Sequence, residues 1–299
     1  MIGSDILLVV SNILFLAVFI EYLVFLLFQQ IVFRIYKFVA RYLFGTTSVP
    51  KDPVYYYFSI FYRIGYKILG IEYVVSKDIV AQINNESTLV LHTHASLHDS
   101  FIILIHLPHN VRFLAKAELF KIPVVKQILR VGRVIPINRT NLTEAIKTLD
   151  QTSVYLKKNY SLVVAPEGTR RRKASITEQD QSPDFKFKKG PFHLAKQNDT
   201  SILPIICYGY KRLSILGGLL MRPGTVYIDV LDKISSADVK RISGPGELHE
   251  HVVSIFNKKF SPHPDSQVMN DSKRNYWYLL GALFLQVITY KILRCVLIK

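Results

Sequence analysis

Between about residues 70 and 260, short apolar or β-branched runs alternate with longer segments of helical period. The runs predict strands at residues 71–75, 88–92, 111–116, 133–137, 162–165, 202–207 and 225–230. The longer segments predict helices at 118–131, at 142–156 with Asn141 as candidate N-cap, and at 191–196. This alternation indicates an α/β domain whose mainly parallel sheet is flanked by helices and carries its ligands at the carboxyl ends of the strands.

The N-terminal segment 6–28 is almost continuously apolar, which matches the roughly 20 residues that a membrane helix needs. Asp5 precedes it, and the basic residues that follow are Arg34, Lys37 and Arg41. This order favours a retained membrane helix over a cleaved signal peptide, and it predicts that the main body faces the cytoplasm. Glu21 within the segment leaves a second arrangement open, in which the helix lies partly in the membrane interface.

The C-terminal segment 276–298 is a second apolar stretch, interrupted by Gln286, Lys291 and Arg294. It either spans the bilayer or lies flat on it, because basic side chains near a helix end can reach the headgroups. We therefore expect a membrane anchor at residues 1–50, an α/β domain at 51–265 and a hydrophobic membrane segment at 276–298.

The composition limits the class of protein. The chain has 299 residues, is 49% hydrophobic, and carries 38 Lys and Arg against 22 Asp and Glu, a formal charge of +16. This apolar content excludes intrinsic disorder, and two cysteines exclude a disulfide-built scaffold. The charge suits nucleic acid, an anionic membrane or an anionic substrate, and the basic run 170–173 permits the first. An anchored chain facing the cytoplasm argues against nucleic acid and leaves an anionic membrane surface and an anionic substrate open.

Three imidazoles and one carboxylate gather in residues 92–99, directly after a predicted strand. His92 and His94 could hold a metal from one face of a strand, but the ligand spacings of metallo-hydrolases are absent. Serine chemistry would need a nucleophile elbow, and no Gly-x-Ser-x-Gly occurs. His94 with Asp99 makes a candidate general base, since a carboxylate fixes the tautomer of the imidazole that takes a proton. Histidines that only cap turns or lie in the core remain the structural alternative.

The His94-x4-Asp99 pattern resembles the signature of the PlsC-like glycerophospholipid acyltransferases, the lysophosphatidic acid acyltransferase family, and further blocks of that family follow in order. They are residues 115–123 (AKAELFKIP), 132–139 (GRVIPINR), 166–170 (PEGTR) with 187–192 (FKKGPF), and 202–205 (ILPI). The resemblance runs from about residue 85 to 230. Its specificity comes from the ordered set, because a lone His-x4-Asp is common.

The resemblance implies that the acceptor's glycerol phosphate is bound by Arg139, Glu167, Gly168, Thr169 and Arg170, with Lys116 and Lys189 as weaker candidates of the same kind. The residue types suit this role, because an arginine fork matches phosphate oxygens and a glycine permits a tight turn after a strand. His94 and Asp99 are the implied catalytic pair. No metal and no cofactor are expected.

The implied activity is transfer of a fatty acyl group from acyl-CoA to the sn-2 hydroxyl of lysophosphatidic acid, giving phosphatidic acid at a membrane, with the catalytic domain facing the cytoplasm and, in a eukaryote, at the endoplasmic reticulum. The alternatives are glycerol-3-phosphate or another lysophospholipid as acceptor, or a non-catalytic lipid-binding homologue. Thr93 stands where the family commonly has Asn, and His98 stands where it could compete for Asp99. Residues 171–184 are polar and aperiodic, and predict a loop or a lid.

Overall fold

A computed structural model describes residues 62–260 with short gaps, together with residues 9–10, 12–14, 16–17, 20 and 59. The gaps are residues 68, 84–85, 97, 108–110, 123–124, 127–128, 131, 139–141, 170–184 and 216–219. The predicted membrane segment 276–298, most of segment 6–28 and the candidate N-cap Asn141 lie outside the described residues. Among the helices that are described, none has the length and hydropathy that crossing a membrane requires.

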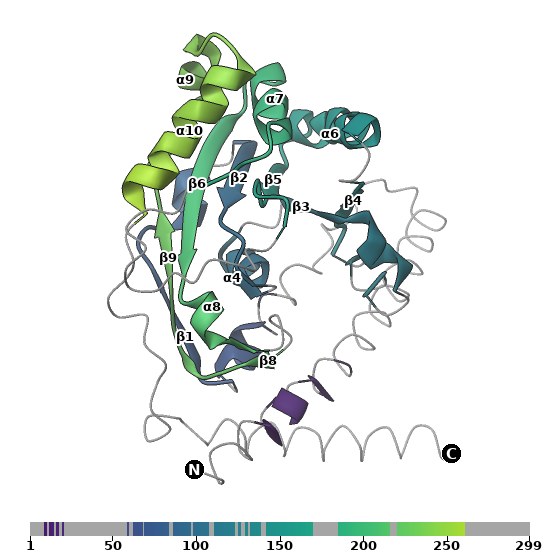
Figure 1. Ribbon diagram of the computed structural model, residues 1–299, viewed down its shortest axis with the longest axis vertical. Coiled ribbons are helices and arrows are strands. Elements are labelled where there is room, and N and C mark those ends of the chain that lie inside the picture. Colours follow the sequence, from purple (N-terminus) through teal and green to yellow (C-terminus); the bar gives the residue numbers. More distant parts are fainter. Residues whose placement is uncertain are drawn as a thin grey trace, which may run out of the picture.

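The central element is a seven-stranded sheet in the order β1-β9-β6-β2-β5-β3-β4 (Figure 1). Its strands are β1 (Ile71–Val75), β2 (Thr88–His92), β3 (Val111–Lys116), β4 (Ile135–Ile137), β5 (Ser161–Val164), β6 (Ser201–Tyr208) and β9 (Gly224–Val230). β6 and β9 pair antiparallel, and the other neighbouring pairs are parallel. The predicted mainly parallel sheet is therefore confirmed, and the first three predicted strands have the observed bounds.

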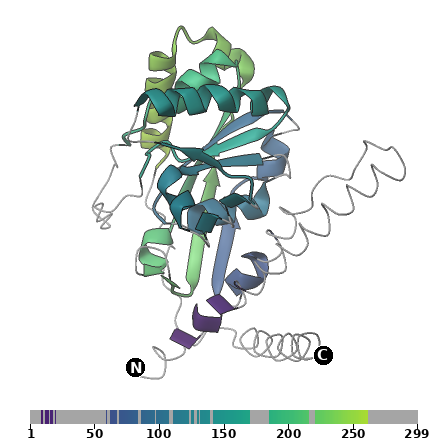
Figure 2. The same cartoon turned by 90° about the vertical axis from the view of Figure 1, so that its right-hand side faces the viewer.

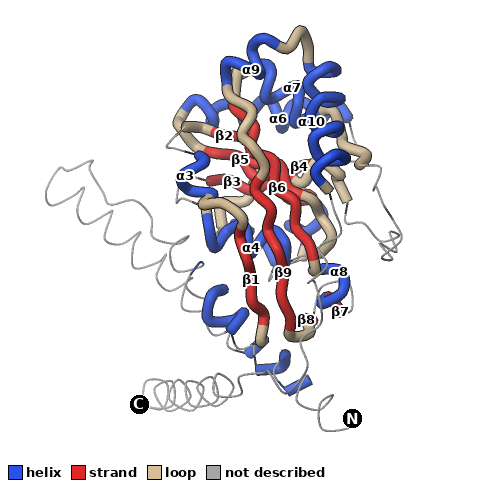
Figure 3. Tube along the Cα trace, turned by 90° about the vertical axis from the view of Figure 1, so that its left-hand side faces the viewer, coloured by secondary structure: helices blue, strands red, loops and turns tan. Residues whose placement is uncertain are grey.

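Helices cover both faces of the sheet, as Figure 3 shows with the sheet between them. One face carries α3 (Ile79–Ile83) and α4 (His98–His106), and the other carries α6 (Leu142–Lys157), α7 (Gly190–Gln197), α9 (Ser236–Arg241) and α10 (Pro245–Lys259). Alternate residues of β2 enter the two cores: Val90 packs with the α3 and α4 side, while Leu89 and Leu91 pack with the α10 side. This alternation is what a strand buried on both faces requires.

Two predicted elements are corrected by the structure. The predicted helix 118–131 is broken: a 3-10 helix, η1 (Ala117–Lys121), ends at Ile122, whose backbone is extended. Pro123 follows Ile122, and the residue before a proline is pushed away from the helical conformation. The predicted strand 133–137 begins only at Ile135, because Arg133 adopts a φ of 47° in the preceding turn.

A small hairpin lies beyond the main sheet. After α8 (Tyr210–Leu213), β7 (Ser214–Ile215) pairs antiparallel with β8 (Leu220–Met221). Near the N-terminus, the described helical turns drawn in purple lie at the lower end of the sheet in Figure 2. There the buried Asn12 carboxamide accepts a hydrogen bond from the Met221 N–H and donates one to the Met221 carbonyl, both at 3.2 Å. The hairpin is thus fixed to the N-terminal segment.

Candidate active site

The candidate site lies where β2 and β5, neighbouring parallel strands, end side by side. β2 ends at His92 and leads through a short loop into α4, and β5 ends at Val164, two residues before Pro166. Because parallel strands present their carboxyl ends at one edge, the two sequence motifs that follow them are brought together. The sequence placed both motifs after strands, and the observed strand order makes them neighbours.

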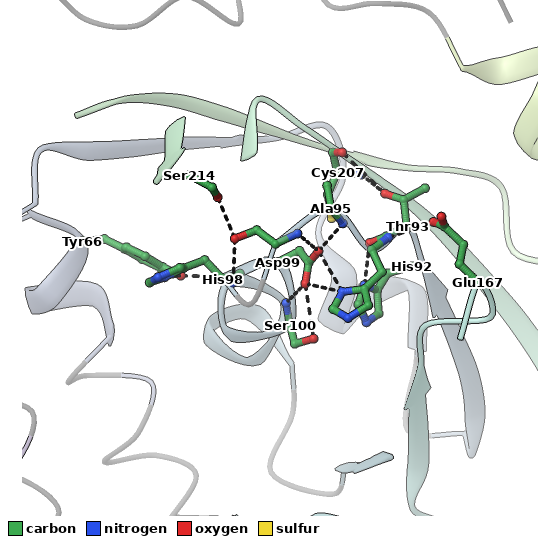
Figure 4. A network of polar contacts seen from close by, with 12 residues as sticks. Tyr66, His92, Thr93, Ala95, His98, Asp99, Ser100, Glu167, Cys207 and Ser214 are labelled. Carbon is green, nitrogen blue, oxygen red and sulfur yellow. Dashed lines mark hydrogen bonds and ion pairs between the residues drawn. The ribbon is translucent and has the colours of Figure 1, made fainter. Parts of the chain in front are cut away.

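His94 and Asp99 face each other across the turn that opens α4. Figure 4 shows the polar contacts that surround Asp99. Nδ1 of His94 lies 3.1 Å from Oδ1 and 3.1 Å from Oδ2 of Asp99. The carboxylate is completely buried, while the imidazole keeps 17% of its side-chain surface exposed. The structure therefore brings these two predicted residues together, with an inaccessible carboxylate and an accessible imidazole.

Backbone amides hold the Asp99 carboxylate in place. Oδ2 accepts from the N–H groups of Ala95 at 2.8 Å and Ser96 at 2.9 Å, and Oδ1 accepts from the Ser100 N–H at 2.7 Å. Burial by itself would raise the pKa of Asp99, but the His94 hydrogen bond, the neighbouring imidazoles and the Ser96 N–H outweigh it and hold the pKa below its usual value. The group is therefore a carboxylate at neutral pH and an acceptor for the His94 Nδ1–H.

This arrangement sets the chemistry of His94. With Nδ1 donating to Asp99, the lone pair of the neutral ring is on Nε2, which is available to take a proton from a hydroxyl. The structure therefore supports general-base chemistry. Among the described residues, no group of three or more His, Cys, Asp and Glu side chains could hold a metal ion.

Neighbouring histidines are occupied elsewhere. His92 is buried and its Nδ1 donates to the Thr93 carbonyl at 2.8 Å; burial is the largest influence on its pKa, which is lowered. His98, which the sequence suggested could compete for Asp99, has its Nδ1 3.3 Å from the Tyr66 hydroxyl. The same hydroxyl donates to the His98 carbonyl at 3.2 Å. Tyr66 has no sequence motif around it, so the sequence did not single it out.

Glu167 contacts the backbone of His94 directly. Its Oε1 accepts the His94 backbone N–H at 2.9 Å, so the motif after β5 holds the loop that carries the dyad. Gly168 follows with a φ of +78°, a backbone conformation that residues other than glycine rarely adopt. A Cβ built there would lie 3.4 Å from Cγ and 3.6 Å from Cε of Lys188, whose side chain therefore runs across the glycine.

The remaining predicted site residues are placed as follows. Thr169 is exposed at the end of the same turn, and Lys189 is exposed at the N-cap of α7. Lys116 ends β3 and pairs with Glu118 at 3.5 Å, so its ammonium is partly engaged. Arg139 and Arg170 lie outside the described residues. Lys188 was not singled out from the sequence, although the alternation of Phe and Lys from residue 185 to 188 is typical of a segment with one buried side.

Residues 185–189 are held from two sides. The Lys188 N–H donates to the Pro166 carbonyl at 2.8 Å, which ties the segment to the turn after β5. From α10, Asn257 Oδ1 accepts the Phe185 N–H at 3.2 Å, and His249 Nε2 donates to the Phe187 carbonyl at 3.0 Å. The rings of Phe185 and Phe187 pack against Phe256 on that helix. α10 therefore supports the lysine that crosses Gly168.

Thr93 shows how this chain replaces the family's usual Asn. Its Oγ1 accepts the Cys207 N–H at 2.8 Å and donates to the Cys207 carbonyl at 3.5 Å, and its backbone N–H donates to Ile205. The side chain is buried and joins the dyad loop to β6. The Thr93 hydroxyl thus accepts one hydrogen bond and donates another, both to the backbone of Cys207. An Asn side chain also has both an acceptor and a donor.

Thr93→Val is expected to lower the free energy of unfolding by about 1–3 kcal/mol, because the buried Cys207 N–H would lose its acceptor while the side-chain shape is kept. Urea unfolding followed by circular dichroism measures this. Thr225→Val is the matched control, since Thr225 is a half-buried strand residue in the same sheet whose hydroxyl has no hydrogen bond among those found in the described part. Equal stability of Thr93→Val and the wild type would contradict this role.

Comparisons with known proteins agree with the geometry. Residues 70–208 match the sequence model of the family described as Acyltransferase. Proteins named 1-acyl-sn-glycerol-3-phosphate acyltransferase are similar in sequence: that of Cocos nucifera is 27% identical over 189 residues, 62% of this chain and 57% of that one. That of Limnanthes douglasii is 30% identical over 178 residues, 59% and 57% of the two chains. The chain thus spans less than two thirds of the length of these relatives.

A solved structure shares the fold. It is that of the 1-acyl-sn-glycerophosphate (LPA) acyltransferase, PlsC, from Thermotoga maritima, which superimposes with a TM-score of 0.64 over 85% of this chain and 95% of that one. At 23% identity this likeness establishes the fold alone. Residues 70–208 of the chain therefore form a domain of the Acyltransferase family, and the described fold is that of the PlsC structure.

Proposed function

We propose that the protein transfers a fatty acyl group from acyl-CoA to the sn-2 hydroxyl of lysophosphatidic acid, giving phosphatidic acid. The observation that carries this proposal is the His94–Asp99 pair, with both Nδ1–O distances at 3.1 Å and an accessible imidazole. The names of the sequence relatives support the acceptor, because several are 1-acyl-sn-glycerol-3-phosphate acyltransferases.

The proposed reaction needs no covalent enzyme intermediate. Nε2 of His94 takes the proton of the acceptor hydroxyl while the hydroxyl oxygen attacks the thioester carbonyl carbon. The tetrahedral intermediate collapses by breaking the carbon–sulfur bond, and the thiolate of CoA accepts the proton from the imidazolium. Asp99 stays ionised throughout and stabilises the imidazolium. The His94–Asp99 pair therefore carries no net charge while His94 holds the substrate's proton, and one negative charge before and after. The chain's residues supply this without a cofactor or metal.

The anionic parts of the substrates are proposed to lie over the turn after β5. The Lys188 side chain crosses Gly168 there, beside the Glu167 that holds His94. No ion pair involving Lys188 occurs within the described part of the chain. Arg139 and Arg170 follow β4 and the same turn in sequence, and their forks suit the acceptor phosphate. Thr169, Lys116 and Lys189 are proposed as further contacts.

The surroundings are proposed to be a membrane. The apolar segments 6–28 and 276–298 would attach the chain to the bilayer, and the basic residues after the first segment favour a cytoplasm-facing domain, at the endoplasmic reticulum in a eukaryote. An acceptor with an acyl chain would then reach the site from the membrane. The partners are lipids and acyl-CoA, not nucleic acid.

The test of the function is a product assay. Purified protein in detergent or vesicles is given labelled acyl-CoA with lysophosphatidic acid, glycerol-3-phosphate or lysophosphatidylcholine, and the lipid formed is identified by mass spectrometry. Phosphatidic acid is the expected product. Preferred acylation of glycerol-3-phosphate or of the choline lipid would move the proposal to that acceptor, and binding of lysophosphatidic acid without any acylated product would identify a lipid-binding homologue.

Arg170→Ala is expected to raise the KM for lysophosphatidic acid by about 10- to 100-fold, because a charge-assisted hydrogen bond to phosphate contributes about 1.5–3 kcal/mol. The KM for acyl-CoA and the melting temperature should change little. Lys173→Ala is the control, since it removes a charge from the same basic run outside the matched motif. An unchanged KM in Arg170→Ala would count against the phosphate role.

A further inference from the structure

The loop that carries the dyad has a support that no sequence motif marks. Ser96, between His94 and Asp99, is completely buried. Its backbone N–H donates to Asp99 Oδ2, and its hydroxyl accepts the His98 N–H at 3.3 Å at the start of α4. The hydroxyl also accepts a hydrogen bond at 2.8 Å from the Oγ of Ser214, which is labelled in Figure 4. Among these contacts of the Ser96 side chain, the bond to Ser214 is the one that comes from outside the loop and α4.

We propose that Ser214 is a positioning residue for the His94–Asp99 dyad and acts through Ser96. The inference rests on the proposed acyltransferase function for its kinetic test. Ser214 lies beyond residues 70–208, the part of the chain that matches the family, and it is separated from Ser96 by 118 positions. Its hydroxyl fixes the rotamer of Ser96, and Ser96 in turn places the backbone that donates to Asp99.

Ser214 can position the dyad loop only if other parts of the structure hold Ser214 in place, and they do. It begins β7, and its register partner across the hairpin is Met221 on β8. Met221 is buried, and the Asn12 carboxamide engages both its N–H and its carbonyl at 3.2 Å. The Met221 sulfur also lies 3.5 Å from the Ser214 Oγ. Ser214 is therefore anchored by the hairpin and the N-terminal segment, neither of which belongs to the dyad loop.

The consequence of losing the Ser214 hydroxyl follows from this geometry. The buried Ser96 Oγ would lose a donor that water cannot easily replace at a completely buried site. The loop from His94 to Asp99 would then sample other arrangements, in which the imidazole is less often aligned with the carboxylate. A misplaced base slows proton transfer without removing a substrate contact, so kcat should fall while both KM values stay near those of the wild type.

The experiment compares Ser214→Ala, Ser214→Thr and the control Ser201→Ala in the full-length protein. Ser201 is also buried, and its hydroxyl bonds the Thr88 hydroxyl at 3.2 Å at the opposite end of β2. Loss of a net hydrogen bond predicts a kcat about 3- to 10-fold lower in Ser214→Ala, with KM changes within about twofold. Ser214→Thr, which keeps the hydroxyl, should recover most of kcat, and Ser201→Ala should keep wild-type kcat even where it lowers the melting temperature.

A double-mutant cycle tests whether Ser214 acts through Ser96. If it does, adding Ser214→Ala to Ser96→Ala should change kcat by less than about twofold, because the shared bond is already absent. Fully multiplied effects would overturn the proposal. So would an unchanged kcat in Ser214→Ala, a raised KM with unchanged kcat, or a threonine variant as slow as the alanine variant.

Hydrogen exchange gives a readout that does not depend on turnover. The Ala95 and Ser96 amides donate to Asp99, so they should exchange about 3- to 10-fold faster in Ser214→Ala and at the wild-type rate in Ser201→Ala. If the wild type has no acyltransferase activity, the proposed function fails while this measurement still decides the positioning role. Unchanged exchange at both amides in Ser214→Ala would reject it.

Discussion

His94→Ala is expected to lower kcat by about 10³-fold, because general-base catalysis by a positioned imidazole contributes 10²- to 10⁴-fold. The imidazole is at the surface of the site, with 17% of its side chain exposed, so its removal should leave the fold intact. The residual rate would come from substrate binding alone. Turnover with purified protein, acyl-CoA and lysophosphatidic acid measures the loss, and sedimentation with vesicles should be the same for the variant and the wild type.

The control for this change is His193→Ala. His193 is exposed on α7 and belongs to none of the contacts described around the dyad, so kcat should stay at the wild-type value. If His94→Ala kept wild-type turnover, the base would have to be another group and the proposed reaction would be wrong. If both variants lost activity together, the loss would reflect a property of the preparation and not of the dyad.

Asp99→Asn is expected to reduce kcat by about 10²- to 10³-fold and to destabilise the fold by about 2–4 kcal/mol. An asparagine keeps one acceptor oxygen, but its amide NH₂ must then face either the Ser100 N–H or the N–H groups of Ala95 and Ser96. Two donors facing each other in a buried site cannot both be satisfied. The imidazole also loses the carboxylate that fixes its tautomer.

The difference in unfolding free energy between the wild type and Asp99→Asn should become smaller as the pH falls. The pKa of Asp99 is lower in the folded protein than its ordinary value, so its ionisation stabilises the fold at pH above the unfolded value of about 3.9. That contribution is lost as the pH falls through the folded pKa. The gap in unfolding free energy between wild type and Asp99→Asn should therefore narrow below about pH 4. Asp150→Asn on the exposed side of α6 is the control, and a gap independent of pH would contradict the assignment.

Local patterns predicted the parts of the site that are contiguous in sequence. His94 and Asp99 are five positions apart at the end of a β-branched run, so their meeting needs only the strand, a tight loop and the start of a helix. The contact between Glu167 and the His94 N–H depends on β2 and β5 being neighbours, and the strand order is not visible in hydrophobic periodicity. The same reason hid Ser214, which has no periodic or motif signal in its surroundings and reaches Ser96 only through tertiary structure.

The helices also divide into those that the sequence predicted and those that it did not. The predicted helix 142–156 agrees with α6 to within one residue because its period is regular, whereas 118–131 is not one helix because Pro123 breaks it. The helix α10 was missed, since its fully buried residues Leu248, Val252 and Phe256 are spaced four apart and most of its other positions are polar or charged. Such a narrow apolar stripe gives a weak signal in sequence, although all three residues are fully buried.

The position of α10 shows that the end of the family match and the end of the packed domain are different places in the chain. The family match ends at Tyr208, yet α10 supplies Asn257 and His249 to the backbone of residues 185–189 and Phe256 to their rings. A chain ended at the family boundary would expose this aromatic cluster to water and release the segment that carries Lys188. A fragment that keeps this cluster covered must therefore extend to Phe260, whose ring also packs on Phe185 and Tyr208.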